Sequence, residues 1–183
     1  DNVYEGNETG IVAIDTVSGA DAAESGSQSV TITITENESA PTVTLATSAT
    51  SIAENAGSSL TLTATLSVAT TADVTVGIST TGTGTEGTDY STISDITISA
   101  GATTGTASFT PTDDNVYEGN ETGIVAISGV SGADAAESGS QSVTITITEN
   151  ESAPTVTLTS SASSITENAG SSLTLTATLS VAT

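Results

Sequence analysis

An internal repeat constrains this chain more than any other feature of its sequence. Residues 1–70 align without a gap with residues 114–183, and 64 of those 70 positions are identical. The shift of 113 residues is the size of a whole domain, and it is much longer than the roughly 20–50 residues of a solenoid unit. The fold of one repeat therefore determines most of the chain.

The segment Glu-Ser-Ala-Pro gives natural boundaries, because it recurs with its proline at Pro41 and Pro154. Residues 1–40 would be the C-terminal part of one repeat, residues 41–153 a complete repeat, and residues 154–183 the N-terminal strands of the next. The near-identity of the copies predicts an array of tandem repeats that is longer than this chain, in which neighbours complete the two partial repeats.

Apolar and polar residues alternate with a period of two along most of the complete repeat, which is the pattern of half-buried strands. We expect strands at residues 42–46, 60–66, 74–78, 96–98, 106–110, 121–127 and 143–148. Residues 82–90 would form a long loop and residues 100–105 a turn. Residues 132–139 would be a helical turn or a loop that joins the last two strands, and we favour the loop. No segment has helical spacing. Seven short strands in about 110 residues predict an all-β fold, an antiparallel β-sandwich.

The charge is entirely of one sign, with 22 Asp and Glu residues and no Lys, Arg or His. Nucleic acid is excluded as a direct partner because phosphate contacts need Lys or Arg, and an anionic membrane surface is excluded for the same reason unless calcium bridges the two. No apolar run approaches the roughly 20 residues of a membrane-spanning helix, so membrane insertion is not expected. The chain has no Cys, so disulfides are absent.

The acidic loop at residues 111–121 carries four carboxylates, those of Asp113, Asp114, Glu118 and Glu121. Like charges about 4 Å apart repel by roughly 4 kcal/mol per pair at an effective dielectric near 20. Since the chain has no cation of its own, a fold that gathers this loop needs an external counter-ion. Oxygen-only ligands on an irregular loop suit Ca²⁺. The alternative is a solvated acidic turn.

Five motifs in order resemble the Calx-beta family, which is named for the calcium-binding domains of sodium–calcium exchangers and is common in large bacterial surface proteins. They are Ile52-Ala-Glu-Asn-Ala-Gly57, Gly87-Thr-Asp-Tyr90, Ala100-Gly-Ala-Thr-Thr-Gly105, Asp113-Asp-Asn-Val-Tyr-Glu-Gly-Asn-Glu121 and Glu149-Asn-Glu151. The resemblance covers residues 41–153. It implies tandem seven-stranded immunoglobulin-like sandwiches, each with a calcium cluster at one end.

The resemblance also implies a set of Ca²⁺ ligands, which we carry over residue by residue. In the complete repeat they are Glu54, Asp89, Asp113, Asp114, the backbone carbonyl of Val116, Glu118, Glu121, Glu149 and Glu151. The equivalents are Asp1, Val3, Glu5, Glu8, Glu36 and Glu38 upstream, and Glu167 downstream. The five other acids of residues 41–153 are expected to be solvated surface residues: Asp73, Glu86, Asp95, Asp134 and Glu137.

Three positions depart from the family pattern. The terminal acidic run is Glu149-Asn150-Glu151 where well-known binders have three Asp residues, and Asn115 replaces an Asp in the central run. These two changes leave the number of ions open between one and four, and we expect two or more. Gly123 stands where the family usually places a bulky inward residue, which predicts a lighter core.

These features predict a structural module, a calcium-rigidified rod in an extracellular filament, adhesin stalk or cell-surface sheath. Its partners would be neighbouring repeats of the same polymer, and lateral or end-to-end self-association is left open. The alternative is an adhesin module that binds a surface, sugar or ice through its Thr-rich strand faces. An enzyme is not expected, because the chain lacks His, Cys and any base to activate a Ser. Four Asn-Glu-Thr and Asn-Glu-Ser segments match the N-glycosylation pattern but lie in the calcium loops.

Overall fold

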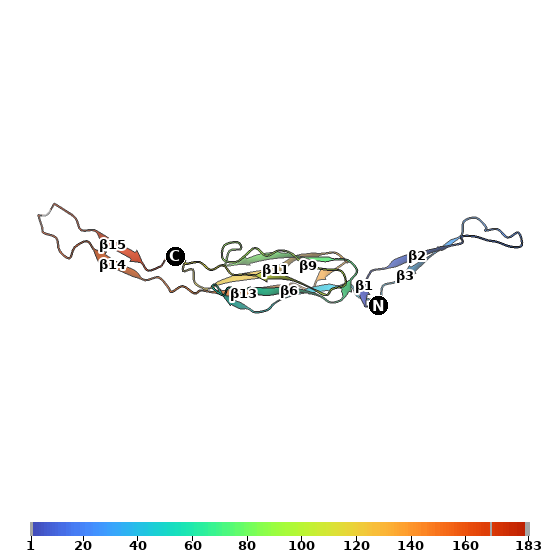
Figure 1. The fold of residues 1–183 in the computed structure, drawn as a ribbon, viewed down its shortest axis with the longest axis horizontal. Coiled ribbons are helices and arrows are strands. Elements are labelled where there is room, and N and C mark those ends of the chain that lie inside the picture. The colour runs from blue at the N-terminus through green and yellow to red at the C-terminus, as the bar shows by residue number, and fades with distance from the viewer. Residues whose placement is uncertain (1, 169, 182–183) are drawn as a thin grey trace.

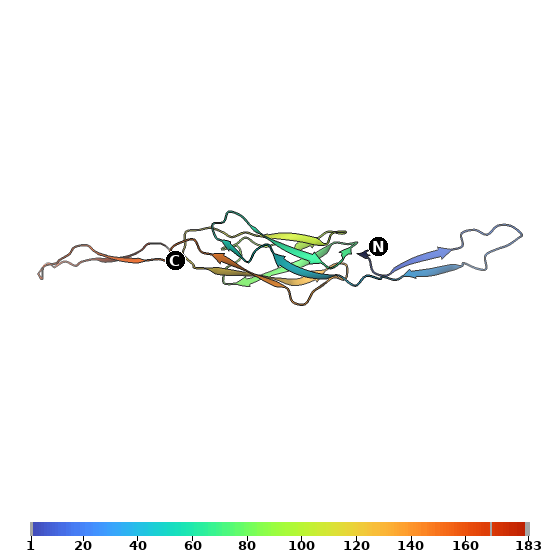
Figure 2. The same ribbon diagram turned by 90° about the horizontal axis from the view of Figure 1, so that it is seen from below.

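A central β-sandwich formed by residues 41–153 lies between two extended hairpins, which project from its opposite ends (Figure 1). The computed structural model describes residues 2–168 and 170–181. A view at right angles shows the same elongated arrangement, with each hairpin pointing outward from its end of the sandwich (Figure 2). Every regular element within these ranges is a strand, and the described residues contain no helix long and apolar enough to cross a membrane.

The sandwich consists of two sheets. The four-stranded sheet has the order β10-β6-β4-β12, with bounds β4 (Thr42–Thr47), β6 (Leu60–Leu66), β10 (Thr104–Phe109) and β12 (Ala136–Glu137). The five-stranded sheet has the order β5-β13-β11-β8-β9, with bounds β5 (Ser51–Ala53), β8 (Val74–Gly82), β9 (Ile96–Ile98), β11 (Glu121–Ser131) and β13 (Ser142–Thr148). Neighbouring strands are antiparallel except in the pairs β12–β4 and β5–β13, which are parallel.

All seven predicted strands of the complete repeat are present, and several bounds differ. β8 and β11 extend further than expected because they pair with each other as far as Gly82 and Gly123, and a register shift near Ile127 carries β11 on to Ser131. β10 begins at Thr104, inside the predicted turn. Residues 132–139 form a loop that contains the short strand β12. The sequence did not predict β5, β7 (Ala69–Thr70) or β12, because segments this short pair through their backbones and have no alternating pattern.

The core lies between the two inner sheet faces. Leu62 from β6, Val76 from β8 and Ile145 from β13 are fully buried, as their alternation with threonine predicts. The rings of Tyr90 and Phe109 stack with their centroids 4.6 Å apart, and both side chains are almost completely buried. Burial of a side chain of this size contributes about 1.5–3 kcal/mol, so this pair is a main support of the sandwich.

The lighter core predicted from Gly123 is wrong, because the stacked aromatic pair fills the space beside this glycine. A Cβ atom added to Gly123 would lie 2.7 Å from Cε2 of Phe109 and 3.6 Å from Cε1 of Tyr90. The two rings come from other segments, so the glycine accommodates a large neighbour and leaves no gap.

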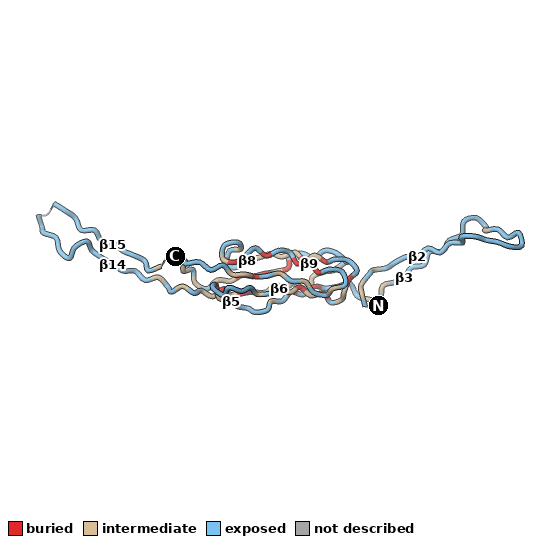
Figure 3. Tube along the Cα trace, in the orientation of Figure 1, coloured by how far each residue is buried: buried red, intermediate tan, exposed pale blue. Residues whose placement is uncertain are grey.

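The flanking hairpins repeat the strand pairs of the sandwich without its core. Their strands are β2 (Glu8–Ala13) with β3 (Ser29–Ile34) upstream, and β14 (Val156–Ser160) with β15 (Leu175–Leu179) downstream. All residues of these four strands are exposed (Figure 3). Before β2, the short strand β1 (Val3–Tyr4) pairs in parallel with β7 of the sandwich.

Candidate metal centre

Acidic side chains from four segments meet at the end of the sandwich that leads to the downstream hairpin. Glu54 follows β5, and Glu149 and Glu151 follow β13, which pairs with β5. Asp89 lies in the long loop after β8. The acidic loop of residues 111–121 connects β10 to β11 and supplies Glu118 and Glu121.

The first carboxylate cluster consists of Glu54, Glu149 and Glu151, each with an oxygen within 4.8 Å of the others. Glu54 is only 9% exposed, and its backbone N–H donates to the carbonyl of Thr148 at 3.0 Å, which continues the β5–β13 pairing. Oε2 of Glu151 is buried and has no hydrogen-bond partner. A buried carboxylate oxygen without a donor is costly, so it points to a missing ligand.

The second carboxylate cluster consists of Asp89, Glu118 and Glu121, and its oxygens also lie within 4.8 Å of one another. The loop of Asp89 is fixed by hydrogen bonds: the backbone N–H of Thr85 donates to Oδ2 of Asp89 at 2.6 Å, and that of Thr112 donates to the Asp89 carbonyl at 2.9 Å. Asp89 precedes Tyr90, whose ring is anchored in the core. The core therefore positions this cluster.

Glu149 connects the two clusters through backbone hydrogen bonds. Its Oε2 accepts the N–H groups of Glu118 and Gly119 at 2.7 and 2.8 Å. Its Oε1 accepts those of Asn150 and Glu151 at 2.9 and 3.0 Å. Four N–H donors hold this carboxylate in place, so the acidic loop and the end of β13 form one unit.

Asn120 is a positioning residue that the sequence did not reveal as such. Its Oδ1 accepts the backbone N–H of Glu149 at 3.0 Å, and the upstream copy repeats the contact between Asn7 and the N–H of Glu36 at 2.8 Å. The presence of this asparagine in both copies of the acidic loop is the signal that could have identified it. Its amide supports the loop through this bond.

The local environment shifts the pKa values of the clustered acids in opposite directions. Burial raises the pKa of Glu54 to about 7, and the nearby charges of Glu149 and Glu151 add to this shift. Burial and the charges of Asp89 and Glu118 raise the pKa of Glu121 to about 7. Backbone hydrogen bonds, above all that from Glu151, lower the pKa of Glu149 to about 2. The clusters thus gather more negative charge than the protein alone accommodates.

A hard divalent cation fits this donor set. All donors are oxygens, the sequence contains no Lys, Arg or His to balance them, and the Glu151 Oε2 atom has no partner of its own. Ca²⁺ takes six to eight oxygen ligands in flexible geometry, which suits clusters made from loops and strand ends. Glu54, Glu149 and Glu151 could hold one ion, and Asp89, Glu118 and Glu121 a second.

The other predicted ligands of the complete repeat lie beside the clusters. Asp114 and Asp113 are exposed, and neither belongs to a group of three. Asp114 donates its backbone N–H to Glu54 at 3.4 Å, and its carboxylate accepts the N–H of Val116 at 2.6 Å. The charge of Asp113 contributes to a raised pKa of Glu151, although the contact with Glu149 and burial contribute more. The role of these residues and of the Val116 carbonyl as ligands stays a prediction.

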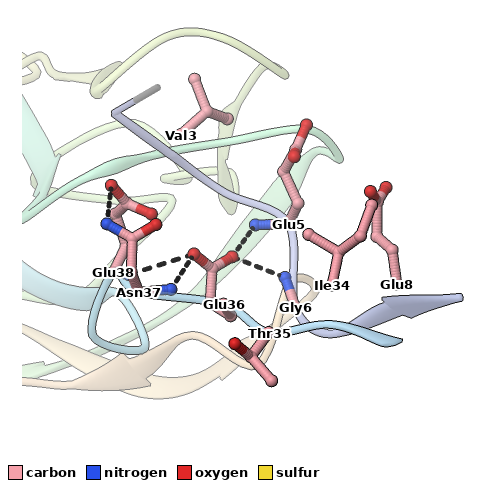
Figure 4. Close-up of a pocket in the computed structure, with 9 residues that line it drawn as sticks. All are labelled: Val3, Glu5, Gly6, Glu8, Ile34, Thr35, Glu36, Asn37 and Glu38. Carbon is pink, nitrogen blue, oxygen red and sulfur yellow. Dashed lines mark hydrogen bonds between the residues drawn. The ribbon is translucent and has the colours of Figure 1, made fainter. Parts of the chain in front are cut away.

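The upstream segment carries copies of two parts of this site, the acidic loop and the acidic residues that follow the last strand (Figure 4). A pocket of about 140 Å³ is lined by all five predicted ligands in this part of the structure: Val3, Glu5, Glu8, Glu36 and Glu38. Glu36 accepts the N–H groups of Glu5 and Gly6 at 2.6 and 2.8 Å, as Glu149 does in the sandwich. Asp1 lies outside the described residues. Glu167 is exposed in a turn downstream and joins no carboxylate cluster of the described residues.

Of the five acids expected to be solvated surface residues, Asp73, Asp95 and Asp134 are exposed, and all five also accept a hydrogen bond. Three of them accept a backbone N–H: Asp73 from Ala100 at 2.8 Å, Asp95 from Ile78 at 2.9 Å and Glu86 from Ile93 at 2.6 Å. Glu137 accepts the N–H of Gln141, and Asp134 accepts the Tyr4 hydroxyl. Acids that cap loop and strand N–H groups look the same in the sequence as acids that face water.

A β-sandwich with carboxylate clusters at one end belongs to the class of calcium-binding β-sandwich modules. The chain belongs to the Calx-beta domain family, whose match spans residues 36–151 and includes every member of both clusters. The Calx-beta domain is a non-catalytic calcium-binding module. The chain is also similar to the crystal structure of an apo-form Calx CBD1 domain, with a TM-score of 0.50 and 16% identity. That similarity covers 60% of this chain and 99% of that one and supports the fold. No curated protein sequence matches the chain.

Proposed function

We propose that this protein is a calcium-binding structural repeat that forms a rigid rod in an extracellular filament, adhesin stalk or surface sheath. The observation that carries the proposal is the buried Oε2 atom of Glu151, which lacks a hydrogen-bond donor within a group of three carboxylates. A bound Ca²⁺ would supply the missing partner and balance the charge.

The position of the first carboxylate cluster links metal binding to stiffness. Glu149 and Glu151 lie between the last strand of the sandwich and Pro154, at the start of the downstream segment. An ion held by these residues and Glu54 would tie the connecting segment to the sandwich. Extracellular calcium modules bind at roughly 10⁻⁴ to 10⁻³ M, so the rod would be stiff outside a cell and would soften under chelation.

Calorimetric calcium titration and thermal melts of the full chain test this proposal. We expect heat of binding and an increase in melting temperature, since a ligand at 100 times its dissociation constant stabilises by about 2.7 kcal/mol per site. Glu54→Gln and Glu151→Gln should weaken binding. Asp15→Asn is a matched control, because it removes one charge from an exposed position in the upstream hairpin. Absence of heat and of any thermal shift in the wild type would refute calcium binding.

An adhesin role is a second candidate, because threonines align across neighbouring strands of the four-stranded sheet. Thr65 of β6 pairs with Thr44 of β4 on one side and with Thr104 of β10 on the other. Thr44 and Thr104 are exposed, and Thr65 is half-buried. Binding to insoluble polysaccharides or inhibition of ice growth, lost when Thr44 and Thr104 are replaced by Lys, would support this role. Wild-type protein with neither activity would count against it.

A further inference from the structure

The end of the sandwich opposite the carboxylate clusters contacts the upstream segment directly. β1 and β7 pair in parallel, with Val3 opposite Ala69 and Tyr4 opposite Thr70. The hydroxyl of Tyr4 also donates to Oδ2 of Asp134 at 3.3 Å. Two separate elements of the sandwich thus hold Tyr4, which pairs with β7 and bonds to the loop 132–135.

The loop 132–135 is fixed by its own sandwich and does not depend on the upstream segment for its shape. Gly132 has φ of 99°, and a Cβ atom there would lie 2.3 Å from the carbonyl oxygen of Asp73. The N–H of Ala135 donates to the Gly132 carbonyl at 3.0 Å. Asp134 has φ of 53°, a left-handed conformation that directs the chain through a tight turn. The acceptor for Tyr4 is therefore preorganised.

The chemistry of the two surfaces is compatible. The upstream segment belongs to an acidic loop, with Glu5 next to Tyr4. The surface that it meets has the small, uncharged Ala69, Ala133 and Ala135, all half-buried. Where an acid is present, at Asp134, it meets a hydroxyl donor. Repulsion is thus reduced at the point of contact although the chain carries a net charge of −22.

We propose that β7 and the loop 132–135 form a docking surface for the acidic loop of the preceding repeat, and that the Tyr4–Asp134 contact fixes the angle between the two repeats. The partner that this surface fits is another copy of the same repeat. The sandwich carries the matching element at its other end, since Val116 and Tyr117 repeat Val3 and Tyr4. Two different surfaces at opposite ends form a head-to-tail interface, which extends into an open filament.

Distance measurements between two spin labels on the full chain test the docking. The protein has no Cys, so Thr9→Cys on β2 and Ser108→Cys on β10 give one pair of labels at exposed positions. We expect a single narrow distance distribution. Tyr4→Phe and Asp134→Gly should each broaden it and increase the undocked fraction roughly three- to tenfold, the effect of losing one hydrogen bond. Glycine is chosen at position 134 because it tolerates the positive φ angle.

The repeat supplies matched controls for both substitutions. Tyr117→Phe and Asp21→Gly make the same changes at the equivalent positions of the other copies, and they should leave the distribution narrow. Asp134→Asn retains an acceptor for the Tyr4 hydroxyl, so this variant should keep the narrow distance distribution of the wild type. The double variant Tyr4→Phe/Asp134→Gly should be no broader than either single variant, because one contact is lost in each case.

Two outcomes would overturn the docking proposal: an unchanged distribution in both Tyr4→Phe and Asp134→Gly, or equal broadening in the controls. The measurement is made at about 10 mM calcium, which is above the dissociation constants of extracellular modules. It does not depend on the calcium proposal, because the contact joins protein groups directly. If the protein binds calcium but Tyr4→Phe does not broaden the distance distribution, only the docking proposal is refuted. If Tyr4→Phe broadens the distribution but the protein does not bind calcium, only the calcium proposal is refuted.

Discussion

The sandwich and its flanking hairpins contain nearly the same sequence in two different environments. Ile145 in β13 is fully buried, whereas the equivalent Ile32 in β3 is 51% exposed. Leu62 in β6 is fully buried, and the equivalent Leu175 in β15 is 65% exposed. The difference is the facing sheet: in the sandwich a four-stranded and a five-stranded sheet bury these side chains between them, whereas each hairpin is a two-stranded sheet whose strands are exposed.

Several features are kept in the hairpins without a facing sheet, which shows that they are encoded locally. β2 and β3 pair Glu8 with Ile34, the same register as Glu121 with Ile147 in the sandwich. The loop residues Ala20 and Asp21 have φ of 51° and 56°, close to the values in the sandwich copy. Strand pairing and loop shape thus come from adjacent residues, whereas burial requires segments that are distant in the sequence.

The largest expected contrast is in the core positions. Ile145→Ala should lower the free energy of unfolding by about 2–5 kcal/mol, since it removes methyl groups from a packed interior. Ile32→Ala, the same change on an exposed face, should stay within about 0.5 kcal/mol. Urea denaturation of the full chain measures both. Equal losses would show that the upstream hairpin is covered in solution.

The two copies of one glycine should also respond differently. Gly123→Ala places a methyl group against the buried Phe109 ring and should cost about 1–3 kcal/mol of unfolding free energy. Gly10→Ala meets nothing within 4 Å and should be close to neutral. Thermal melts compare the two variants. A neutral Gly123→Ala would mean that the aromatic pair moves freely to make room.

In calcium-free buffer, pH should change the free energy of unfolding by less than the substitutions above, because counter-ions partly screen the charges of the carboxylate clusters. The folded state raises the pKa of Glu54 from 4.5 to about 7, so folding favours the protonated carboxyl. That contribution to stability is fully present below pH 4.5 and is lost as the pH rises to about 7. Denaturation midpoints across this range measure the loss.

Saturating calcium should remove this pH dependence near neutrality, and Glu54→Gln should reduce it. The lowered pKa of Glu149 acts in the opposite sense, since its contribution is present above pH 4.5 and is lost as the pH falls to about 2. A flat calcium-free profile between pH 4.5 and 7 would contradict the burial of charge in the first carboxylate cluster.

Much of the fold could be predicted because half-buried strands alternate visibly, as Val74 and Val76 do on either side of Thr75. β5 and β7 could not be predicted, because strands of two or three residues that pair through the backbone are too short to show an alternation of apolar and polar residues. Six of the eight predicted acids of the complete repeat fall into two clusters, and their role as ligands stays a prediction. Asp113 and Asp114 lie outside them because the loop turns both toward solvent.

The remaining features depend on partners far away in the sequence. Gly123 suggested a gap, and only the position of the rings of Tyr90 and Phe109 shows that the space is filled. The contact between Tyr4 and Asp134 depends on how one segment lies against another, which alternation within a strand does not indicate. The backbone donors that cap Glu149 are likewise brought together by the fold.

The parallel pairing of β5 with β13 has a mechanical consequence. Its three residue pairs join Ser51–Ala53, which β4 connects to the entry of the chain into the sandwich, to Thr146–Thr148, next to its exit. Entry and exit lie at opposite ends of the sandwich (Figure 1). Tension applied along the long axis therefore pulls the two strands past each other in shear, so their hydrogen bonds must break together and not one after another. Such an arrangement resists stretching best along the direction in which a filament is pulled.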